Sequence, residues 1–419
     1  DGAKYGTSWL ERGQSLLGLV VLLMFCWFFS TNRRNVPWRV VCWGIGLQIM
    51  LGVIVLKTQF GYWLFDKVNA LFVSLMSFTT QGSSFIFGSL AKVNNVPVGP
   101  GGAFGPVGNT GQVAEIGAFF AFNVLPTIIF FSSLMAVLYH LGVMQFIVKI
   151  VAVVMQKTMG TSGSETLSAS GNIFVGQTEA PLLVRPFVKG MTQSELMAVM
   201  TGGFATVAGG VMAAYVSFLE GRFTGIAGHL LSASIMSAPA ALVCAKLMIP
   251  EDHPEESETY GEIRTDLEKI DTNVIDAAAR GAGDGLKLAL NVAAMLLAFI
   301  ALIALFNSVL GWAGGFFGAD NLTLEGILGY VMAPFAWLMG VPWSDATAVG
   351  ELLGVKTVVN EFVAYLGLSG QLQNGTIENP RSIIIAIYAL CGFANFGSIA
   401  IQIGGIGGIA PSRRQDLAK

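Results

Sequence analysis

The stretch "GNIFVGQTEAPLLV" (residues 171–184) sets polar side chains inside a strongly apolar part of the chain. Its polar members are two amides, a hydroxyl and a carboxylate: Asn172, Gln177, Thr178 and Glu179. Gly176 allows the backbone to turn, and Pro181 suits the first turn of a half-helix that returns. The pattern predicts a hairpin whose tip carries the polar groups.

The composition around this stretch is typical of a membrane protein. Of the 419 residues, 53% are hydrophobic and 12% are charged, whereas an ordinary soluble domain has roughly 25% charged residues. Several apolar runs approach or exceed the ~18 residues that suggest a membrane-spanning helix. They predict an all-α polytopic membrane protein with seven spanning helices, at residues 14–30, 38–57, 116–139, 194–219, 224–248, 286–312 and 382–403.

Two kinds of feature outside these runs predict no second site. They are the segments that connect the runs, and the cysteine and histidine residues. Residues 68–91 are uncharged but carry "TTQGSS", which favours an interfacial or partly buried helix. The acidic segment "EDHPEESETYGEIRTDLEKID" (residues 251–271) is predicted to be a solvated loop. The cysteines and histidines lack the spacing of metal ligands, and a structural metal is not expected: Cys26, Cys42, Cys244, Cys391, His140, His229 and His253.

Basic residues orient the predicted helices. Arg33, Arg34 and Arg39 lie between the first two of them, and Lys and Arg accumulate on the cytoplasmic side of membrane proteins. The loop after the first helix is therefore expected inside and the N-terminus outside. Counting helices then places the broken stretch at residues 143–190 on the inner side and the one at 327–368 on the outer side.

An internal repeat supports this arrangement. "GFATVAGGV" (residues 203–211) recurs in part as "GFANFGSIA" (residues 392–400), and each follows a broken stretch that carries a carboxylate. The order of helix, broken hairpin and broken helix thus occurs twice, in opposite orientation. This is the pattern of an inverted-repeat transporter, in which two re-entrant hairpins and two broken transmembrane helices surround a site near the midplane.

Placing Glu179 and Glu361 near the midplane of the membrane costs free energy. A carboxylate at the centre of a membrane helix costs about 2.5–3.5 kcal/mol on insertion scales. One interpretation is a surface hairpin whose glutamate reaches water, and Lys356 makes an ordinary ion pair with Glu361 possible. The functional interpretation is a solvated site where the hairpin tips and the broken helices meet.

The polar groups predicted at this site suit a neutral solute. Neither tip contains Arg or Lys, so an anion would meet uncompensated negative charge. Carboxylates accept hydrogen bonds from hydroxyl groups, and amides pair with the edge of a ring. Asn395 and Ser398 add polar capacity, while Val211 and Phe393 offer an apolar face to the ring or simply pack.

Three motifs now identify a resemblance. "GNIFVGQTEAP", "VNEFVAY" and "GFANFGSIAIQIGG" closely resemble the concentrative nucleoside transporters, and the likeness runs from the first helix to the end of the chain. These proteins are secondary transporters that carry nucleosides inward on a cation gradient. The resemblance, to the sodium-coupled bacterial type, implies a homotrimer in the bacterial inner membrane. It implies no enzyme activity, no nucleic-acid partner and no cofactor other than the coupling ion.

The resemblance also implies roles for individual residues. The nucleobase would be bound by Gln177, Thr178 and Glu179, and its pocket lined by Val211 and Phe393. The ribose would be bound by Glu361, Asn395 and Ser398. Sodium would be held by the Asn172 side chain, the carbonyls of Val175 and Val207, and the hydroxyl of Thr206. The family often has Ser in place of Thr206, and Thr keeps the oxygen.

This interpretation divides the chain into five segments. They are scaffold helices with an interfacial segment (1–142), the first repeat (143–250), an acidic cytoplasmic loop (251–285), a scaffold helix with an outer loop (286–326), and the second repeat (327–419). The family continues past "APSRRQDLAK" with one more spanning helix, whereas the sequence given stops at Lys419. The second repeat is therefore expected to lack the counterpart of the helix at 224–248.

Other hypotheses remain open at this point. If Glu179 titrates, the carrier is proton-coupled rather than sodium-coupled. Glu179 and Glu361 could instead be the acid and base of an intramembrane enzyme, although no H-E-x-x-H or G-x-S-x-G motif is present. A channel, or an inverted-repeat carrier for another solute such as an amino acid, would share the same architecture. The preference between purines and pyrimidines does not follow from the residues.

Overall fold

The computed structural model describes residues 8–91, 96–97, 113–114, 120–219, 223, 225–260, 271–316, 318 and 322–419. Three predicted segments lie partly outside the described residues. These are the start of the helix at 116–139, residues 261–270 of the acidic loop, and part of the outer loop within 286–326.

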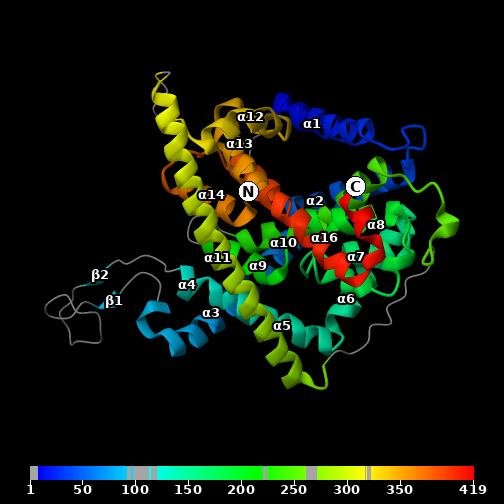
Figure 1. The fold of residues 1–419 in the computed structure, drawn as a ribbon, viewed down its shortest axis with the longest axis horizontal. Helices are drawn as coiled ribbons and strands as arrows, with labels where there is room; N and C mark the ends of the chain where they lie inside the picture. Colours follow the sequence, from blue (N-terminus) through cyan, green and yellow to red (C-terminus); the bar gives the residue numbers. More distant parts are fainter. Residues whose placement is uncertain are drawn as a thin grey trace.

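Helices make up nearly all of the described chain, as the sequence predicts (Figure 1). The first third contains α1 (Trp9–Phe28), α2 (Trp38–Lys57), α3 (Gln59–Phe87), η1 (Gly88–Ala91), α4 (Phe120–Asn123) and α5 (Leu125–His140). The middle contains α6 (Val143–Met159), α7 (Gly163–Gly171), η2 (Ala180–Val184), η3 (Val188–Gly190), α8 (Gln193–Ala205), α9 (Gly209–Leu219), α10 (Ile226–Met248) and η4 (Pro254–Glu256). The last part contains α11 (Val274–Gly315), α12 (Leu324–Leu338), α13 (Trp343–Val358), α14 (Glu361–Gln373), α15 (Pro380–Leu390), α16 (Phe396–Ile409), η5 (Pro411–Arg413) and α17 (Arg414–Ala418). The short strands β1 (Val96–Pro97) and β2 (Val113–Ala114) pair antiparallel, with Val96 opposite Ala114.

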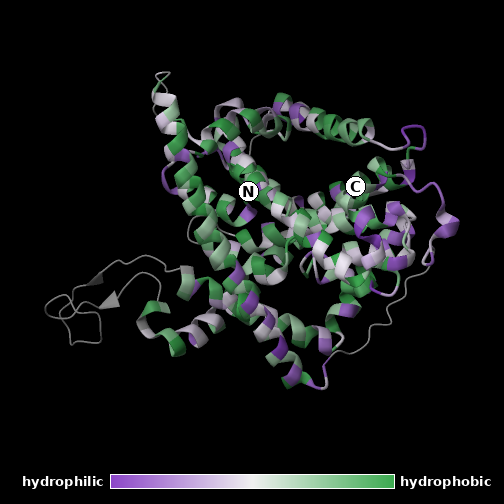
Figure 2. Ribbon diagram, in the orientation of Figure 1, coloured by the Kyte–Doolittle hydropathy of each residue, from purple (hydrophilic) through white to green (hydrophobic). Residues whose placement is uncertain are grey.

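Seven helices in the described residues are long and apolar enough to cross a membrane. Six of them match predicted spans. The seventh is α3, for which the sequence favours an interfacial or partly buried place. The span predicted at 382–403 is instead divided into α15 and α16, each too short to cross alone. Apolar residues are spread along the outer helices, while hydrophilic residues gather toward the loop after α10 (Figure 2).

Helix α11 begins earlier than the predicted span at 286–312. Its first turn starts at Val274, where the Asn273 side chain accepts hydrogen bonds from two backbone N–H groups. The acidic loop predicted at 251–285 therefore overlaps the start of this helix, whose exposed face carries Arg280. The opposite face packs closely on α5, because a Cβ atom at Gly281 would lie 2.6 Å from that of Ala136.

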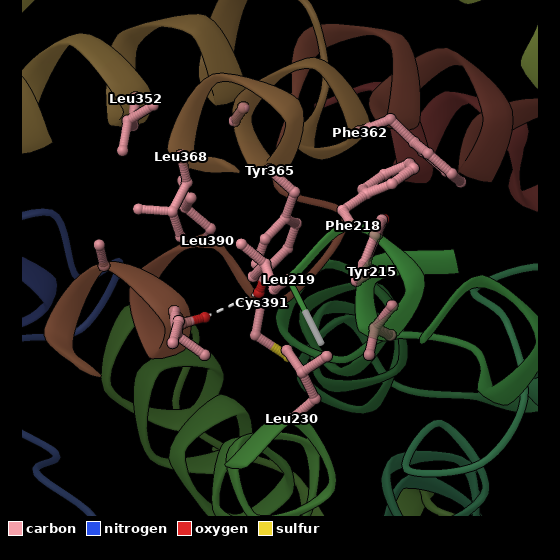
Figure 3. Close-up of a cluster of buried hydrophobic side chains, with 14 of the residues drawn as sticks. Tyr215, Phe218, Leu219, Leu230, Leu352, Phe362, Tyr365, Leu368, Leu390 and Cys391 are labelled. Carbon is pink, nitrogen blue, oxygen red and sulfur yellow. Dashed lines mark hydrogen bonds between the residues drawn. The ribbon is translucent and has the colours of Figure 1, made fainter. Parts of the chain in front are cut away.

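Both predicted broken helices are interrupted. Residues 206–208 separate α8 from α9, and residues 391–395 separate α15 from α16. Between them lies a shared apolar core, in which Tyr215 of α9 stacks on Tyr365 of α14 with ring centroids 4.4 Å apart (Figure 3). The Tyr365 hydroxyl donates to the Ile387 carbonyl of α15 at 2.7 Å. The core therefore joins elements from the two repeats.

The stretch predicted to form the second hairpin consists of parts of three helices. Helices α12 and α13 meet at an angle of 117°. Helix α13 ends at Val358, and α14 begins at Glu361 after only two residues. The Asn360 side chain caps α14 by accepting from the N–H of Val363 at 3.0 Å. Glu361 is thereby held at the first position of a helix, close to the tip.

Candidate functional site

The predicted tips and helix breaks surround a cavity of about 160 Å³. This volume is far above the roughly 15 Å³ that a single water molecule needs. All eight predicted substrate residues line the cavity: Gln177, Thr178, Glu179, Val211, Glu361, Phe393, Asn395 and Ser398. Residues far apart in the sequence thus meet around a space that can hold a small polar solute.

Glu361 is a buried hydrogen-bond acceptor at one side of the cavity. Its side chain is held by the Tyr215 hydroxyl, which donates to Oε1 at 3.1 Å, and by Asn395 Nδ2, which donates to Oε2 at 2.8 Å. Its place in the first turn of α14 also suits a negative charge. A carboxylate has about four lone-pair sites, so capacity for further donors remains.

Gln177 connects the first tip to the second broken helix. Its amide nitrogen donates to Ser398 Oγ at 3.0 Å, and its oxygen accepts from Gln402 Nε2 at 3.1 Å. Gln402 also donates to the carbonyl of Met200 in α8. Gln402 is not among the predicted site residues, although it lies in the motif "GFANFGSIAIQIGG". Its position one helical turn after Ser398 was the available signal.

The broken helices touch where the repeated motif begins. Gly392 has a φ of 106°, and a Cβ atom there would lie 2.7 Å from the carbonyl oxygens of Phe204 and Ala205. Any side chain at this position would both clash and strain the backbone. Gly392 therefore explains why the second motif opens with glycine: the C-terminal end of α8 rests directly on it.

The remaining predicted residues cover the other sides of the cavity. Glu179 is the exposed member, and its carboxylate folds back over Gly176. Val211 and Phe393 are buried and form part of the apolar wall. Helix α11 completes that wall with four apolar residues that the sequence analysis missed, since they look like any other part of a spanning helix: Leu288, Val292, Met295 and Leu296.

The four predicted sodium ligands lie at the ends of α7 and α8. Asn172 caps α7 and is fully buried, and in the described part of the chain neither of its side-chain polar atoms has a hydrogen-bond partner. Thr206 follows α8 and donates to the Gly202 carbonyl at 2.9 Å. Val175 and Val207 lie in non-helical backbone. Because an unsatisfied buried amide costs about 1–3 kcal/mol, the orphaned Asn172 oxygen fits a cation ligand.

Comparisons with known proteins identify the family of the chain. The family profile described as "Na+ dependent nucleoside transporter C-terminus" matches residues 229–419, and its N-terminal counterpart matches residues 17–90. A profile described as "Nucleoside recognition" matches residues 121–222. "Uncharacterized transporter YutK" of Bacillus subtilis (strain 168) is 44% identical over 406 residues, which are 96% of this chain and 93% of that protein. The chain belongs to the Na+ dependent nucleoside transporter family.

Mammalian members of the family are longer. "Sodium/nucleoside cotransporter 1" of Rattus norvegicus is 44% identical over 427 residues, covering 98% of this chain and 60% of that protein. "Solute carrier family 28 member 3" of Homo sapiens is 42% identical over the whole chain, which spans 58% of the human protein. The homologues are transporters and not enzymes, which counts against the hypothesis of an intramembrane enzyme.

Solved structures of a nucleoside transporter have the same fold. CNTnw in an inward-facing, substrate-bound state has a TM-score of 0.84 and 42% identity, covering 97% of this chain and 92% of that one. A doubly substituted CNTnw in an outward-facing state has a TM-score of 0.86, also with 42% identity, and covers 98% of this chain and 92% of that one. The architecture of this family member is thus that of a concentrative nucleoside transporter.

Proposed function

We propose that this chain imports nucleosides by coupling them to a sodium gradient through alternating access. One observation carries the proposal. Eight side chains from two tips and two broken helices line a single cavity, and the orphaned amide of Asn172 lies at the base of the first tip. The site therefore offers both a place for a neutral polar solute and a ligand for a hard cation.

The two sides of the cavity suit the two parts of a nucleoside. Glu361 accepts hydrogen bonds and, with Asn395 and Ser398, binds the hydroxyl groups of the ribose. Gln177, Thr178 and Glu179 bind polar atoms at the edge of the base. Val211 and Phe393 lie against its face. No Arg or Lys is among the described residues that line the cavity, which favours a neutral nucleoside over a nucleotide.

Sodium is the favoured coupling ion because its four proposed ligands are neutral oxygens: those of Asn172, Val175, Thr206 and Val207. A proton would need a titratable group, and none of these four residues has one. Glu179 would take the coupling role only in a proton-driven carrier. Thermodynamic linkage requires that sodium and nucleoside raise each other's affinity by the same factor.

Alternating access follows from the repeat. We propose that the stretches at 143–190 and 327–368 form re-entrant hairpins that travel with the two broken helices as one body, past the remaining helices. Likeness to both inward-facing and outward-facing structures of CNTnw supports this proposal. We propose that the protomer belongs to a homotrimer in the bacterial inner membrane, with its N-terminus outside. Helix α3 would lie at the boundary between membrane and water.

The proposed function is tested by uptake of radiolabelled uridine into proteoliposomes. Uptake should require an inward sodium gradient and should concentrate uridine that is chemically unchanged. Adenosine and guanosine should be tested as competitors, with uracil to show whether the ribose is needed. Uptake that ignores sodium and follows an imposed pH gradient would contradict sodium coupling.

The alternating-access part is tested by labelling. A cysteine placed at Thr178 should react with a membrane-impermeant reagent from one side or the other, according to the sodium and uridine present. Thr178 lies in the cavity and is only partly buried, so it reports on the opening of the site. Equal labelling from both sides under all conditions would indicate a channel.

A further inference from the structure

Each repeat brings two helix C-termini together beside a broken helix. In the first repeat, α7 packs on α8 and both end near the first tip, at Gly171 and Ala205. In the second, α13 packs on α15, and they end at Val358 and Leu390. A helix C-terminus carries about half a negative charge on its unpaired carbonyls. Two such ends together attract a cation.

The first pair of ends contains no basic side chain of its own. Neither α7 nor α8 has a basic residue in its last turn. The group at the junction is the side-chain amide of Asn172, which is neutral, buried and without a hydrogen-bond partner among the described residues. Neither helix supplies a positive charge at this junction, and the proposed function places sodium there.

The second pair contains a lysine. Lys356 lies in the last turn of α13 with only 7% of its surface exposed. Its ammonium donates to the carbonyls of Ala389 and Cys391, at 2.8 and 3.3 Å. Glu361 accepts instead from Tyr215 and Asn395. The cationic group is thus directed at the end of α15, which differs from the simple ion pair that the sequence left open.

The carbonyls at the two junctions correspond in the repeat. "GFATVAGGV" and "GFANFGSIA" begin at Gly203 and Gly392, so the preceding residues, Gly202 and Cys391, are equivalent. The Gly202 carbonyl accepts from Thr206, and a Cβ atom at Gly202 would lie 3.2 Å from the Asn172 amide nitrogen. The Cys391 carbonyl accepts from Lys356. A neutral amide in one repeat and an ammonium in the other thus occupy related places.

We propose that Lys356 is a fixed cation that takes, in the second repeat, the place that sodium takes in the first. The protomer then has one exchangeable sodium site where its internal symmetry would allow two. Each nucleoside is carried with one sodium ion, and the junction behind the second tip stays balanced whether or not sodium is bound. This inference rests on the proposed function for the identity of the first ion.

The test counts sodium ions bound by the purified full chain. Equilibrium binding of radioactive sodium to the unaltered protein should show one saturable site per protomer. Lys356→Gln replaces the ammonium with a neutral amide, the group that Asn172 supplies in the first repeat. This variant should show two sites, and its sodium dependence of uridine binding should steepen from a Hill coefficient of about 1 toward about 2.

Two further variants serve as controls. Lys287→Met removes an exposed lysine of α11 and should keep one site. Lys356→Arg keeps the fixed charge and should also keep one site. Two sites in the unaltered protein would overturn the inference, and this holds even if Lys356→Gln does not fold. A folded Lys356→Gln protein that gains no site would overturn it as well.

The outcome also separates this inference from the proposed function. An unaltered protein that binds no sodium would contradict the sodium site at Asn172. If Lys356→Gln nevertheless binds one sodium ion, the role of Lys356 as a fixed cation is supported even though the sodium site at Asn172 is not. If neither protein binds sodium, both proposals are wrong.

Discussion

The two predicted hairpin tips differ in length and in the way they hold their carboxylates. The first tip has eight residues between α7 and η2, at 172–179, and its Glu179 is exposed. The second has only Val359 and Asn360 between α13 and α14, and its Glu361 is buried and held by two side-chain donors. The short tip therefore presents a rigid acceptor, whereas the long tip presents several adaptable polar groups.

This difference teaches how one fold can serve two parts of a solute. A ribose has the same hydroxyl groups in every nucleoside, so a rigid acceptor suits it. Bases differ in their edges, so a longer tip with an amide, a hydroxyl and a carboxylate suits them. The long tip also leaves Asn172 beside Gly202 near the end of α8, so the proposed ion and base ligands share one segment.

The largest effect is expected at the rigid tip. Glu361→Gln turns one acceptor into a donor that faces Asn395 or a sugar hydroxyl. Each hydrogen bond to a charged group is worth about 1.5–3 kcal/mol, so uridine uptake should fall at least ~100-fold. Initial rates in proteoliposomes measure it. Glu351→Gln, on α13 and outside the cavity lining, is the control and should keep uptake. Parental uptake by a folded Glu361→Gln protein would contradict the assignment of Glu361.

The next largest effect is expected at the long tip. It should change the sodium dependence of uptake more than the KM for uridine. Asn172→Ala removes the orphaned amide without touching the residues that line the cavity. Half-maximal uptake should need ~10-fold more sodium, which corresponds to a loss of about 1.4 kcal/mol. The apparent KM for uridine at saturating sodium should change much less. An equal change in both parameters would show that Asn172 does not act through the ion.

A smaller effect is expected where the two repeats are joined. Gln402→Leu removes the donor to the Gln177 oxygen and the extra side-chain donor to the Met200 carbonyl. The KM for uridine should rise roughly 3- to 10-fold, because one neutral hydrogen bond is worth about 0.5–1.5 kcal/mol. Gln48→Leu on α2 is the control, since the Gln48 side chain donates to the Gly44 carbonyl of its own helix. Unchanged KM with lowered thermal stability would assign Gln402 to structure alone.

The smallest effect is expected from Tyr215→Phe, which removes one of two donors to Glu361 and keeps the stacked ring. The KM for uridine should change by no more than about 5-fold, since the remaining Asn395 bond still holds the carboxylate. Tyr365→Phe is the matched control, because its hydroxyl donates to the Ile387 carbonyl instead. If the two variants have the same effect on KM, the hydrogen bond from Tyr215 to Glu361 has no special role.

Much of the helical framework could be predicted because its signals are local. The span predicted at 38–57 matches α2 at both ends. A run of apolar residues can be identified in the sequence without knowing which other helices it contacts. The two broken helices were found because glycines interrupt repeated motifs. The start of α11 was missed because its exposed charges resemble a loop, and only packing on α5 shows them to be one face of a helix.

The sequence by itself determined the helical membrane class, the two polar tips and the residue types available to a solute. These depend on composition and on short motifs. Only the tertiary structure decided that Gln402 holds Gln177, that Tyr215 holds Glu361, and that Lys356 is directed at the end of α15. Such pairings join residues separated by long stretches of chain. Their geometry depends on how the helices cross, and no local pattern of residues records it.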